Sequence, residues 1–222
     1  MIVLARLFLL LPLATAEAQL PPSLASHVDP VFPAELKGTS VTDGYVTVAY
    51  VVRLDGAIDD AVALEATHAA FATAVLDVLP SWRFSPVVDA VPRREVLRLL
   101  FQQTGAVTPL SHRDATKAAF PLALAARLPI RTVGWPELTA PPERLASPSP
   151  ATTATSGGNV AISYVIDTQG RVRVPAVVGE SDPGLAAAAV AAVKQWRFTP
   201  PLHNGLPVLV EDTRSFTFAA RP

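Results

Sequence analysis

The sequence contains no cysteine among its 222 residues, which excludes disulfide bonds, thiolate zinc sites, iron–sulfur clusters and thiol catalysis. It has no excess of charge either, because 18 basic side chains are balanced by 19 acidic ones. The net charge of −1 excludes a polybasic nucleic-acid-binding protein that works by neutralising phosphates. No Gly-rich phosphate loop and no Gly-x-Ser-x-Gly nucleophile motif is present. No residue pattern therefore supports an enzyme.

The titratable side chains form no catalytic or metal-binding pattern. The acidic pairs Asp59-Asp60 and Glu211-Asp212 are typical of solvated turns or strand edges rather than of an acid–base dyad. The four histidines have no metal-ligand spacing, and none has a plausible carboxylate pair beside it; they are His27, His68, His112 and His203. We therefore predict no catalytic residue, no metal site and no cofactor.

The N-terminus has the pattern of an export signal. Arg6 precedes an apolar run at residues 7–13, and small-x-small patterns that end at Ala16 and Ala18 follow it. The apolar stretch is shorter than the ~20 residues that a membrane-spanning helix needs, which disfavours the alternative of an uncleaved anchor. We predict a signal peptide at residues 1–18, cleaved after Ala16 or after Ala18, and a periplasmic protein without a transmembrane anchor.

Proline is abundant, with 22 residues, about twice the usual ~5%. Proline is excluded from helix interiors and from central strands. Such a density indicates either compact modules with Pro-rich connections or a largely disordered chain. The internal repeat described next favours the compact modules.

The sequence contains an internal repeat. Residues 44–56 align with residues 158–170 at a shift of 114 positions. Residues 82–86, with the sequence Trp-Arg-Phe-Ser-Pro, align with residues 196–200 at the same shift. Two separate matches at one offset, without a gap between them, predict two copies of one structural unit.

The repeat predicts the domain organisation. Beyond the second match the shift becomes 115, so that Phe101 aligns with Phe216. We predict one module at residues 29–104, a connector at residues 105–131 and a second module at residues 132–220. The first module is the more divergent copy.

A segment inside the second module has the composition of a flexible loop. Pro, Ser, Thr, Ala and Gly dominate residues 141–158. The segment separates Trp135-Pro136 from the first strand, whereas the corresponding Phe32-Pro33 lies close to the first strand of the first copy. We therefore predict a flexible loop at residues 141–158.

Each copy begins with a predicted β-hairpin. Apolar residues alternate with other residues over 46–52 and 160–166, which is the period of a strand with one buried face. Asp55-Gly56 and Gln169-Gly170 supply turn residues, and a second strand follows each turn.

A helix follows each hairpin. The capping residues Ser181-Asp182-Pro183 mark the start of the second helix, and Pro80 is expected to break the last turn of the first. Trp82 and Trp196 end the two apolar stripes, so we interpret them as core residues. Arg83 and Arg197 are interpreted as solvated or carbonyl-capping neighbours. The apolar positions at helical spacing are Phe71, Val75, Val78 and Trp82 in the first copy and Leu185, Ala189, Ala192 and Trp196 in the second.

A last strand completes each copy, at residues 94–103 and 208–218. The predicted fold class is α+β, with two tandem β-β-α-β modules. Each module is a small antiparallel sheet packed on one helix.

These motifs, in this order, resemble the TonB C-terminal domain family, present twice. They are a Phe-Pro start at Phe32-Pro33, a Gly-x-Val-x-Val-x-Tyr-x-Val strand, an Asp-x-x-Gly turn at 167–170, a Trp-Arg-Phe-x-Pro helix end and a Gly-x-Pro-Val strand at 205–208. The second copy is the more faithful. The first copy departs from the family motifs at residues 53–55 and 90–93. We therefore interpret the first copy as mainly structural rather than as a binding module.

The resemblance implies a periplasmic protein-interaction module linked to outer-membrane receptor transport. In such a module an extended segment of the partner, here a receptor segment or another peptide, pairs with the edge of the sheet. By resemblance, the receiving edge is the last strand of the second copy. Its predicted partner-binding residues are Val208, Leu209, Val210, Glu211, Asp212, Thr213, Arg214, Ser215 and Phe216.

Two alternatives stay open. The protein can be a structural pseudo-dimer of the cell envelope, in which the two last strands pair with each other and leave no free edge. A periplasmic enzyme is the third hypothesis. Full energy transducers of this family also have an inner-membrane anchor and a long Pro-rich spacer, which we do not find, so we do not expect this protein to transmit force.

Overall fold

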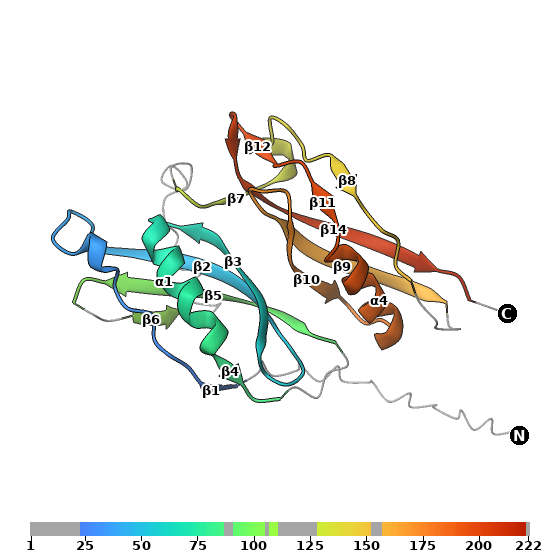
Figure 1. The fold of residues 1–222 in the computed structure, drawn as a ribbon, viewed down its shortest axis with the longest axis horizontal. Coiled ribbons are helices and arrows are strands. Elements are labelled where there is room, and N and C mark those ends of the chain that lie inside the picture. The colour runs from blue at the N-terminus through green and yellow to red at the C-terminus, as the bar shows by residue number, and fades with distance from the viewer. Residues whose placement is uncertain (1–22, 87–90, 105–106, 111–127, 152–156, 221–222) are drawn as a thin grey trace, which may run out of the picture.

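The computed structural model describes residues 23–86, 91–104, 107–110, 128–151 and 157–220. The predicted signal peptide at residues 1–18 lies outside the described residues, as do His112 and most of the predicted connector. The described part is elongated and has two halves along its long axis (Figure 1). We call residues 23–110 the first half and residues 128–220 the second half.

The first half contains a four-stranded antiparallel sheet with the order β3-β2-β5-β6. A short second sheet pairs β1 with β4. The elements are β1 (Leu24–Ser26), η1 (Ala34–Leu36), β2 (Asp43–Val52), β3 (Ile58–Ala66), α1 (Ala69–Val78), η2 (Leu79–Ser81), β4 (Arg83–Phe84), β5 (Arg93–Gln102) and β6 (Val107–Leu110).

The second half contains a four-stranded sheet with the order β10-β9-β14-β7, in which the β14–β7 pair is parallel. Short sheets pair β8 with β11 and β12 with β13. The elements are β7 (Thr132–Val133), η3 (Trp135–Glu137), β8 (Arg144–Ala146), β9 (Gly158–Ile166), β10 (Val172–Val178), α4 (Pro183–Val193), β11 (Arg197–Phe198), β12 (Leu202–His203), β13 (Leu206–Pro207) and β14 (Leu209–Phe218). The fold is therefore a mixed α+β fold of mostly strands, with two α-helices among the described residues.

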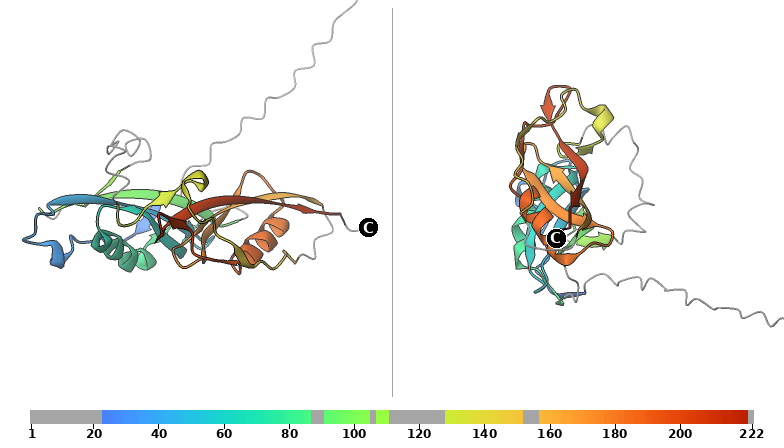
Figure 2. Two further views of the ribbon diagram at one scale, coloured as in Figure 1. Left: turned by 90° about the horizontal axis from the view of Figure 1, so that it is seen from above. Right: turned by 90° about the vertical axis from the view of Figure 1, so that its right-hand side faces the viewer.

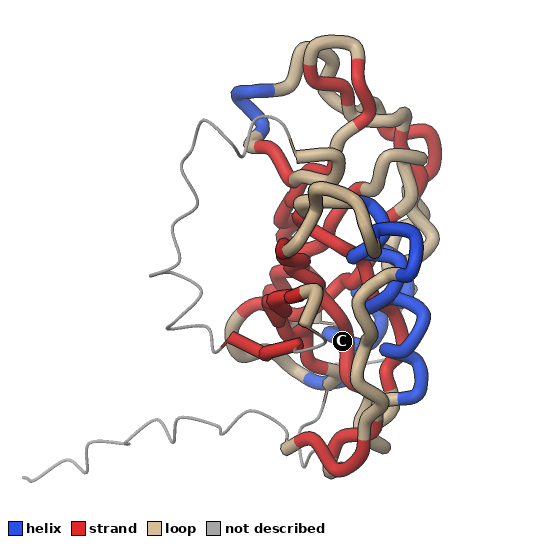
Figure 3. The backbone as a smooth tube through the Cα atoms, turned by 90° about the vertical axis from the view of Figure 1, so that its left-hand side faces the viewer, coloured by secondary structure: helices blue, strands red, loops and turns tan. Residues whose placement is uncertain are grey.

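Each sheet packs one face against one helix. Val48 of β2 and Phe71 of α1 belong to the same buried cluster in the first half. Ile162 of β9 and Leu185 of α4 do so in the second half. Both helices lie on the same side of the strands (Figures 2 and 3). Burial of the alternating residues supplies most of the stability of each sheet, at about 1.5–3 kcal/mol per large apolar side chain.

The two hairpin turns require glycine. Gly56 and Gly170 have φ angles of 82° and 74°, a region that residues with a Cβ rarely adopt. A Cβ at Gly56 would lie 2.0 Å from the carbonyl oxygen of Phe84, and one at Gly170 would lie 1.9 Å from that of Phe198. The predicted turns are confirmed, and each also brings the chain close to the strand after the helix.

The predicted helix signals are confirmed. The Asp182 side chain caps α4 by accepting hydrogen bonds from the backbone N–H groups of Gly184 and Leu185, at 2.9 and 3.0 Å. The helix α1 ends at Val78, and the chain continues as η2, which contains Pro80. Proline thus ends the α-helix where its missing N–H would break the hydrogen-bond ladder.

The two Trp-Arg pairs are structural, as predicted. Trp82 and Trp196 are only 4% and 3% exposed. The guanidinium of Arg83 donates to the carbonyl of Trp82, and that of Arg197 donates to the carbonyl of Trp196, each at 2.7 Å. The arginines therefore cap carbonyl groups at the ends of the helical segments.

The repeat shift predicted for the last strands is wrong by two residues. Phe101 of β5 lies opposite Gly44 of β2, and Phe218 of β14 lies opposite Gly158 of β9. Because Gly44 and Gly158 are repeat partners, Phe101 corresponds to Phe218 and not to Phe216, and the shift is 117. An error of two residues preserves the in-and-out alternation, so the sequence pattern could not reveal it.

The prediction of a flexible loop at residues 141–158 is wrong for its first part. This part contains β8, which pairs with β11. The indole Nε1 of Trp196 donates to the Pro148 carbonyl at 3.0 Å, just as that of Trp82 donates to the Val28 carbonyl at 2.9 Å. The strand β8 is thus the counterpart of β1. Because β1 lies at Leu24–Ser26, the first half begins before residue 29, the predicted start of the first module.

The two Pro-containing segments that we aligned before the first strands are not equivalent. Phe32 is buried in the first core, with its ring centroid 5.5 Å from that of Phe71. Trp135 is 38% exposed and lies beside β14, where its Nε1 donates to the Glu211 carbonyl. The shared aromatic-Pro pattern therefore has two different structural roles.

The two halves contact each other through the faces of the sheets that carry no helix. Ala49 and Val51 of β2 form one buried cluster with Val165 of β9, Val174 of β10 and Leu209 of β14. The last strands do not pair with each other, because β5 lies between β2 and β6 and β14 lies between β9 and β7. The pairing of the two last strands, on which the alternative of a structural pseudo-dimer depended, is therefore wrong.

Charged side chains join the halves as well. Asp60 accepts from the Arg173 Nε at 3.1 Å and from the Val174 backbone N–H at 2.7 Å, and Val174 has a positive φ of 44°. Asp59 forms an ion pair with Lys194. Of the two expected settings for this acidic pair, a solvated turn or a strand edge, the structure shows the strand edge, because both residues lie on the edge strand β3. Both carboxylates bind groups of the other half.

Residues 130–133, which include β7, contact the edges of both four-stranded sheets. The Ala66 backbone N–H of β3 donates to the Ile130 carbonyl at 3.0 Å. The Thr132 hydroxyl donates to the Leu64 carbonyl of β3 at 3.1 Å, while Thr132 and Val133 pair with β14. The end of the predicted connector therefore contributes edge contacts to each half.

Candidate protein-interaction edge

The last strand β14 contains eight of the nine predicted partner-binding residues, and Val208 directly precedes it. One side of β14 pairs with β9 continuously, from Val210 opposite Ile166 to Phe218 opposite Gly158. Only the other side, which we call the outer side of β14, is placed to receive a further strand.

The first part of the outer side is occupied by the chain itself. The Leu209 backbone N–H donates to the Arg131 carbonyl at 3.3 Å, and β7 continues this parallel pairing to Val210. The indole Nε1 of Trp135 donates to the Glu211 carbonyl at 3.0 Å. Leu209 and Val210 are also buried side chains. The predicted edge is therefore closed over its first residues, which sequence reasoning missed because no pattern marked β7 as a strand.

The remainder of the outer side has no strand partner within the described ranges. Backbone groups of alternate residues point to the same side of a strand, so those of Thr213, Ser215 and Thr217 share the direction of Leu209 and Glu211. The Thr213 N–H is held by the neighbouring Asp212 carboxylate at 2.8 Å. Among the described residues, no strand pairs with the outer side of β14 beyond Val210. The open edge consists of residues 213–218.

The side chains on the helix-side face of β14 have structural partners. The Tyr164 hydroxyl donates to the Asp212 carboxylate at 2.7 Å. Burial and this hydrogen bond raise the pKa of Tyr164 above its usual value. The Phe216 ring lies 5.7 Å from the Trp196 ring. These residues fix the strand in place rather than forming a free binding surface.

The opposite face of β14 is polar and exposed. Glu211 forms an ion pair with Arg94 of β5, which is a contact between the halves. Thr213, Ser215 and Thr217 are exposed. Small polar residues at an open edge keep it soluble while leaving its backbone groups accessible.

The first half has a strand where β14 is open. With the shift of 117, Arg98 corresponds to Ser215 and Phe101 corresponds to Phe218. The strand β6 pairs antiparallel with β5 between these two positions, Arg98 and Phe101. Residues 215–218 of the open edge are thus the counterpart of the stretch of β5 that β6 covers.

The described histidines have local structural roles or ion-pair partners. The His68 Nδ1 accepts from the Ala70 N–H and caps α1, and His27 forms an ion pair with Asp29. Among the residues that the structure describes, no group of three or more His, Asp or Glu side chains could hold a metal ion.

Residues 146–219 match the family model described as Gram-negative bacterial TonB protein C-terminal. The match covers about one third of the chain and includes β9, β10, α4 and the whole of β14. The family consists of non-catalytic protein-interaction domains, so the match indicates a TonB-like interaction role in the cell envelope. No curated protein matches the chain.

The helices of the described residues are short. None of them is long and apolar enough to cross a membrane.

Proposed function

We propose that this protein is an exported, periplasmic TonB-like interaction module that binds an extended segment of a partner protein by strand addition. The observation that carries the proposal is the open outer side of β14 at residues 213–218, inside the region that matches the TonB family. An open edge presents unpaired N–H and C=O groups, and an extended peptide completes their hydrogen bonds.

The first half supports the proposal because it contains the same geometry in a completed form. There β6 is the fourth strand, and it pairs with the residues of β5 that correspond to the open residues of β14. We infer that the two halves are divergent copies of one module and that the first copy has a structural role. The partner that fits the family is a periplasm-exposed segment of an outer-membrane receptor.

The proposal is tested by backbone amide NMR of the full chain, titrated with peptides from periplasm-exposed segments of outer-membrane receptors. We expect saturable shifts and slower amide exchange along residues 213–218, without comparable changes along β6. No response of residues 213–218 to any of these peptides would favour a purely structural role instead.

A matched pair of variants tests the backbone mechanism. Ser215→Pro removes one outward N–H, which an edge strand tolerates, and we expect it to weaken peptide binding at least tenfold. Ser215→Ala keeps that N–H and should bind as the unmodified chain does. Circular dichroism and thermal unfolding confirm that both variants fold. Equal binding by the two variants would contradict strand addition at this position.

A further inference from the structure

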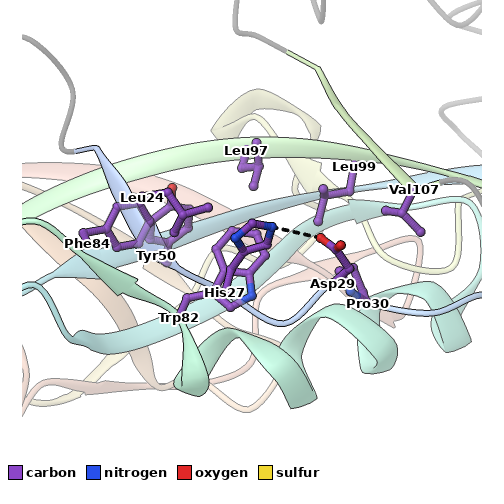
Figure 4. Close-up of a pocket in the computed structure, with 10 residues that line it drawn as sticks. All are labelled: Leu24, His27, Asp29, Pro30, Tyr50, Trp82, Phe84, Leu97, Leu99 and Val107. Atoms are coloured by element: carbon purple, nitrogen blue, oxygen red, sulfur yellow. Dashed lines mark ion pairs between the residues drawn. The ribbon is translucent and has the colours of Figure 1, made fainter.

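An apolar pocket of about 210 Å³ lies in the first half, away from β14. It is formed by the segment 24–30, the strands β2, β4, β5 and β6, and Trp82 at the end of η2 (Figure 4). The wall is made of aromatic and aliphatic side chains, which include Leu24, Tyr50, Trp82, Phe84, Leu97 and Leu99. A concave, mostly apolar wall with few polar groups is typical of a small-molecule site.

The pocket exists because the first half has smaller side chains than the second at corresponding positions. With the register of the last strands, Leu99 corresponds to Phe216, whose ring packs 5.7 Å from Trp196. Leu24 corresponds to Arg144, whose guanidinium lies 4.6 Å from the centre of the Trp196 ring. The space that Phe216 and Arg144 fill in the second half is therefore left open in the first.

The pocket also contains polar groups that are suited to one hydrogen-bonding ligand group. Tyr164 of the second half donates to Asp212, whereas no hydrogen bond from its counterpart Tyr50 is found among the described residues. Burial, followed by the nearby charge of Glu95, raises the pKa of Tyr50, so its hydroxyl stays protonated and can donate. At the rim, the exposed His27 and Asp29 form an ion pair at 3.1 Å.

The size of the pocket limits the ligand. An apolar cavity of about 150 Å³ is enough to bind benzene. A pocket of about 210 Å³ therefore holds a single ring with one or two small substituents, but not a long acyl chain. The rings of Tyr50, Trp82 and Phe84 favour an aromatic ligand, because aromatic rings attract one another in edge and offset arrangements.

We propose that this pocket binds a small amphiphile consisting of one aromatic ring with one neutral hydrogen-bonding group, in a class typified by 4-alkylphenols. The ring lies among the aromatic and leucine side chains, and the polar group bonds to the Tyr50 hydroxyl or to the His27–Asp29 pair. This site is separate from β14, so it adds a small-molecule function to the first half that does not depend on strand addition.

The test uses 4-methylphenol and toluene as probes, with ¹³C-methyl NMR of the full chain. We expect saturable shifts of the methyl groups of Leu24, Leu97 and Leu99, and at least threefold tighter binding of 4-methylphenol than of toluene. No saturable shift at these methyl groups, including the outcome that other residues of the chain fill the pocket, overturns the proposal.

Two variants of β5 provide the matched comparison. Leu99→Phe introduces the ring that the second half has at this position, and we expect at least a tenfold loss of 4-methylphenol affinity. Val96→Phe introduces the same ring nearby on the other face of β5, where Val96 is 41% exposed, and should leave binding unchanged. If Leu99→Phe does not fold, Leu97→Phe serves the same purpose. Equal binding by a folded filled-pocket variant and Val96→Phe overturns the proposal.

A third variant tests the polar part of the ligand. Tyr50→Phe keeps the wall but removes the hydroxyl, so the preference for 4-methylphenol over toluene should fall by at least half. If both Tyr50→Phe and His27→Ala keep the full preference for 4-methylphenol over toluene, the proposal that the pocket binds a hydrogen-bonding group of the ligand is overturned. The Ser215→Pro variant should keep full 4-methylphenol binding, which separates failure of this proposal from failure of strand addition.

Discussion

The last strands of the two halves differ in what covers their outer sides. In the first half, β6 pairs with β5 at Arg98 to Phe101 and completes the sheet. In the second half, β7 covers only the start of β14. The stretch of β14 that corresponds to the β6-covered part of β5 has no strand on its outer side in the part of the chain that the structure describes. One architecture therefore gives a closed edge in one half and an accessible edge in the other. The difference between the two edges depends on the short strands β6 and β7, which lie outside the hairpin and helix that both halves contain.

The largest expected change in the free energy of unfolding comes from substitutions in the two hairpin turns. They test whether these turns are equivalent although the sheet edges of the two halves differ. Gly56→Ala and Gly170→Ala place a Cβ within about 2 Å of a backbone carbonyl oxygen, at positive φ, so each should lower the free energy of unfolding by about 3 kcal/mol or more. Gly38→Ala is the control, because its φ is 79° but nothing lies within 4 Å, and it should cost only about 1 kcal/mol. Urea unfolding measures all three.

The second prediction concerns the contact between the halves. Asp60→Asn removes the charge that pairs with Arg173, while both side chains are about a quarter exposed, so we expect a loss of about 2 kcal/mol. Asp55→Asn, in an ion pair whose side chains are more than half exposed, should cost less than about 0.5 kcal/mol. Equal costs in urea unfolding would show that the Asp60 pair does not hold the halves together.

The third prediction compares the two corresponding tyrosines. Tyr164→Phe removes the hydrogen bond to Asp212 and should cost about 1 kcal/mol at neutral pH, whereas Tyr50→Phe should cost almost nothing. Folding raises the pKa of Tyr164, so the unfolded chain loses its proton first as the pH rises. Stability from this group is therefore complete below about pH 10 and falls above it. Urea unfolding between pH 8 and pH 11 should show a smaller decline for Tyr164→Phe.

The smallest expected change in stability comes from exchanging the side chains at two corresponding positions, Leu99 and Phe216. Leu99→Phe fills the pocket and should stabilise the protein by up to about 1 kcal/mol. Phe216→Leu removes a ring that packs on Trp196 and should destabilise it by about 1 kcal/mol. Thermal unfolding measures both changes. Changes of the same sign would show that the two positions are not structural counterparts.

Local signals in the sequence predicted much of the fold. The Asp182 cap, the break at Pro80, the glycine turns and the buried Trp residues each depend on chemistry within a few residues, and each is confirmed. Contacts between distant residues were harder to predict. The strand β8 lies in a Pro-rich segment, and its strand character comes from pairing with β11 rather than from its composition.

The candidate site could be predicted only in part. The strand itself was located correctly, because it follows the Trp-Arg-Phe-x-Pro and Gly-x-Pro-Val motifs in the chain. The coverage of Leu209 to Glu211 by β7 and Trp135 depends on tertiary contacts that the sequence does not mark. One usable signal was missed for the contact between the halves. Asp59 and Arg173 have opposite charges at positions that the sequence repeat aligns. Each forms an ion pair between the halves, Asp59 with Lys194 and Arg173 with Asp60.

The segment at residues 130–133 has a consequence for how the protein unfolds. Ile130 and Thr132 bond to β3, while Thr132 and Val133 pair with β14, so neither sheet keeps its complete edge when the other melts. Loss of either half also exposes the cluster around Val51 and Val165. Cooperativity arises when separate parts share such contacts. We therefore expect calorimetry to show a single unfolding transition, with the two halves melting as one cooperative unit.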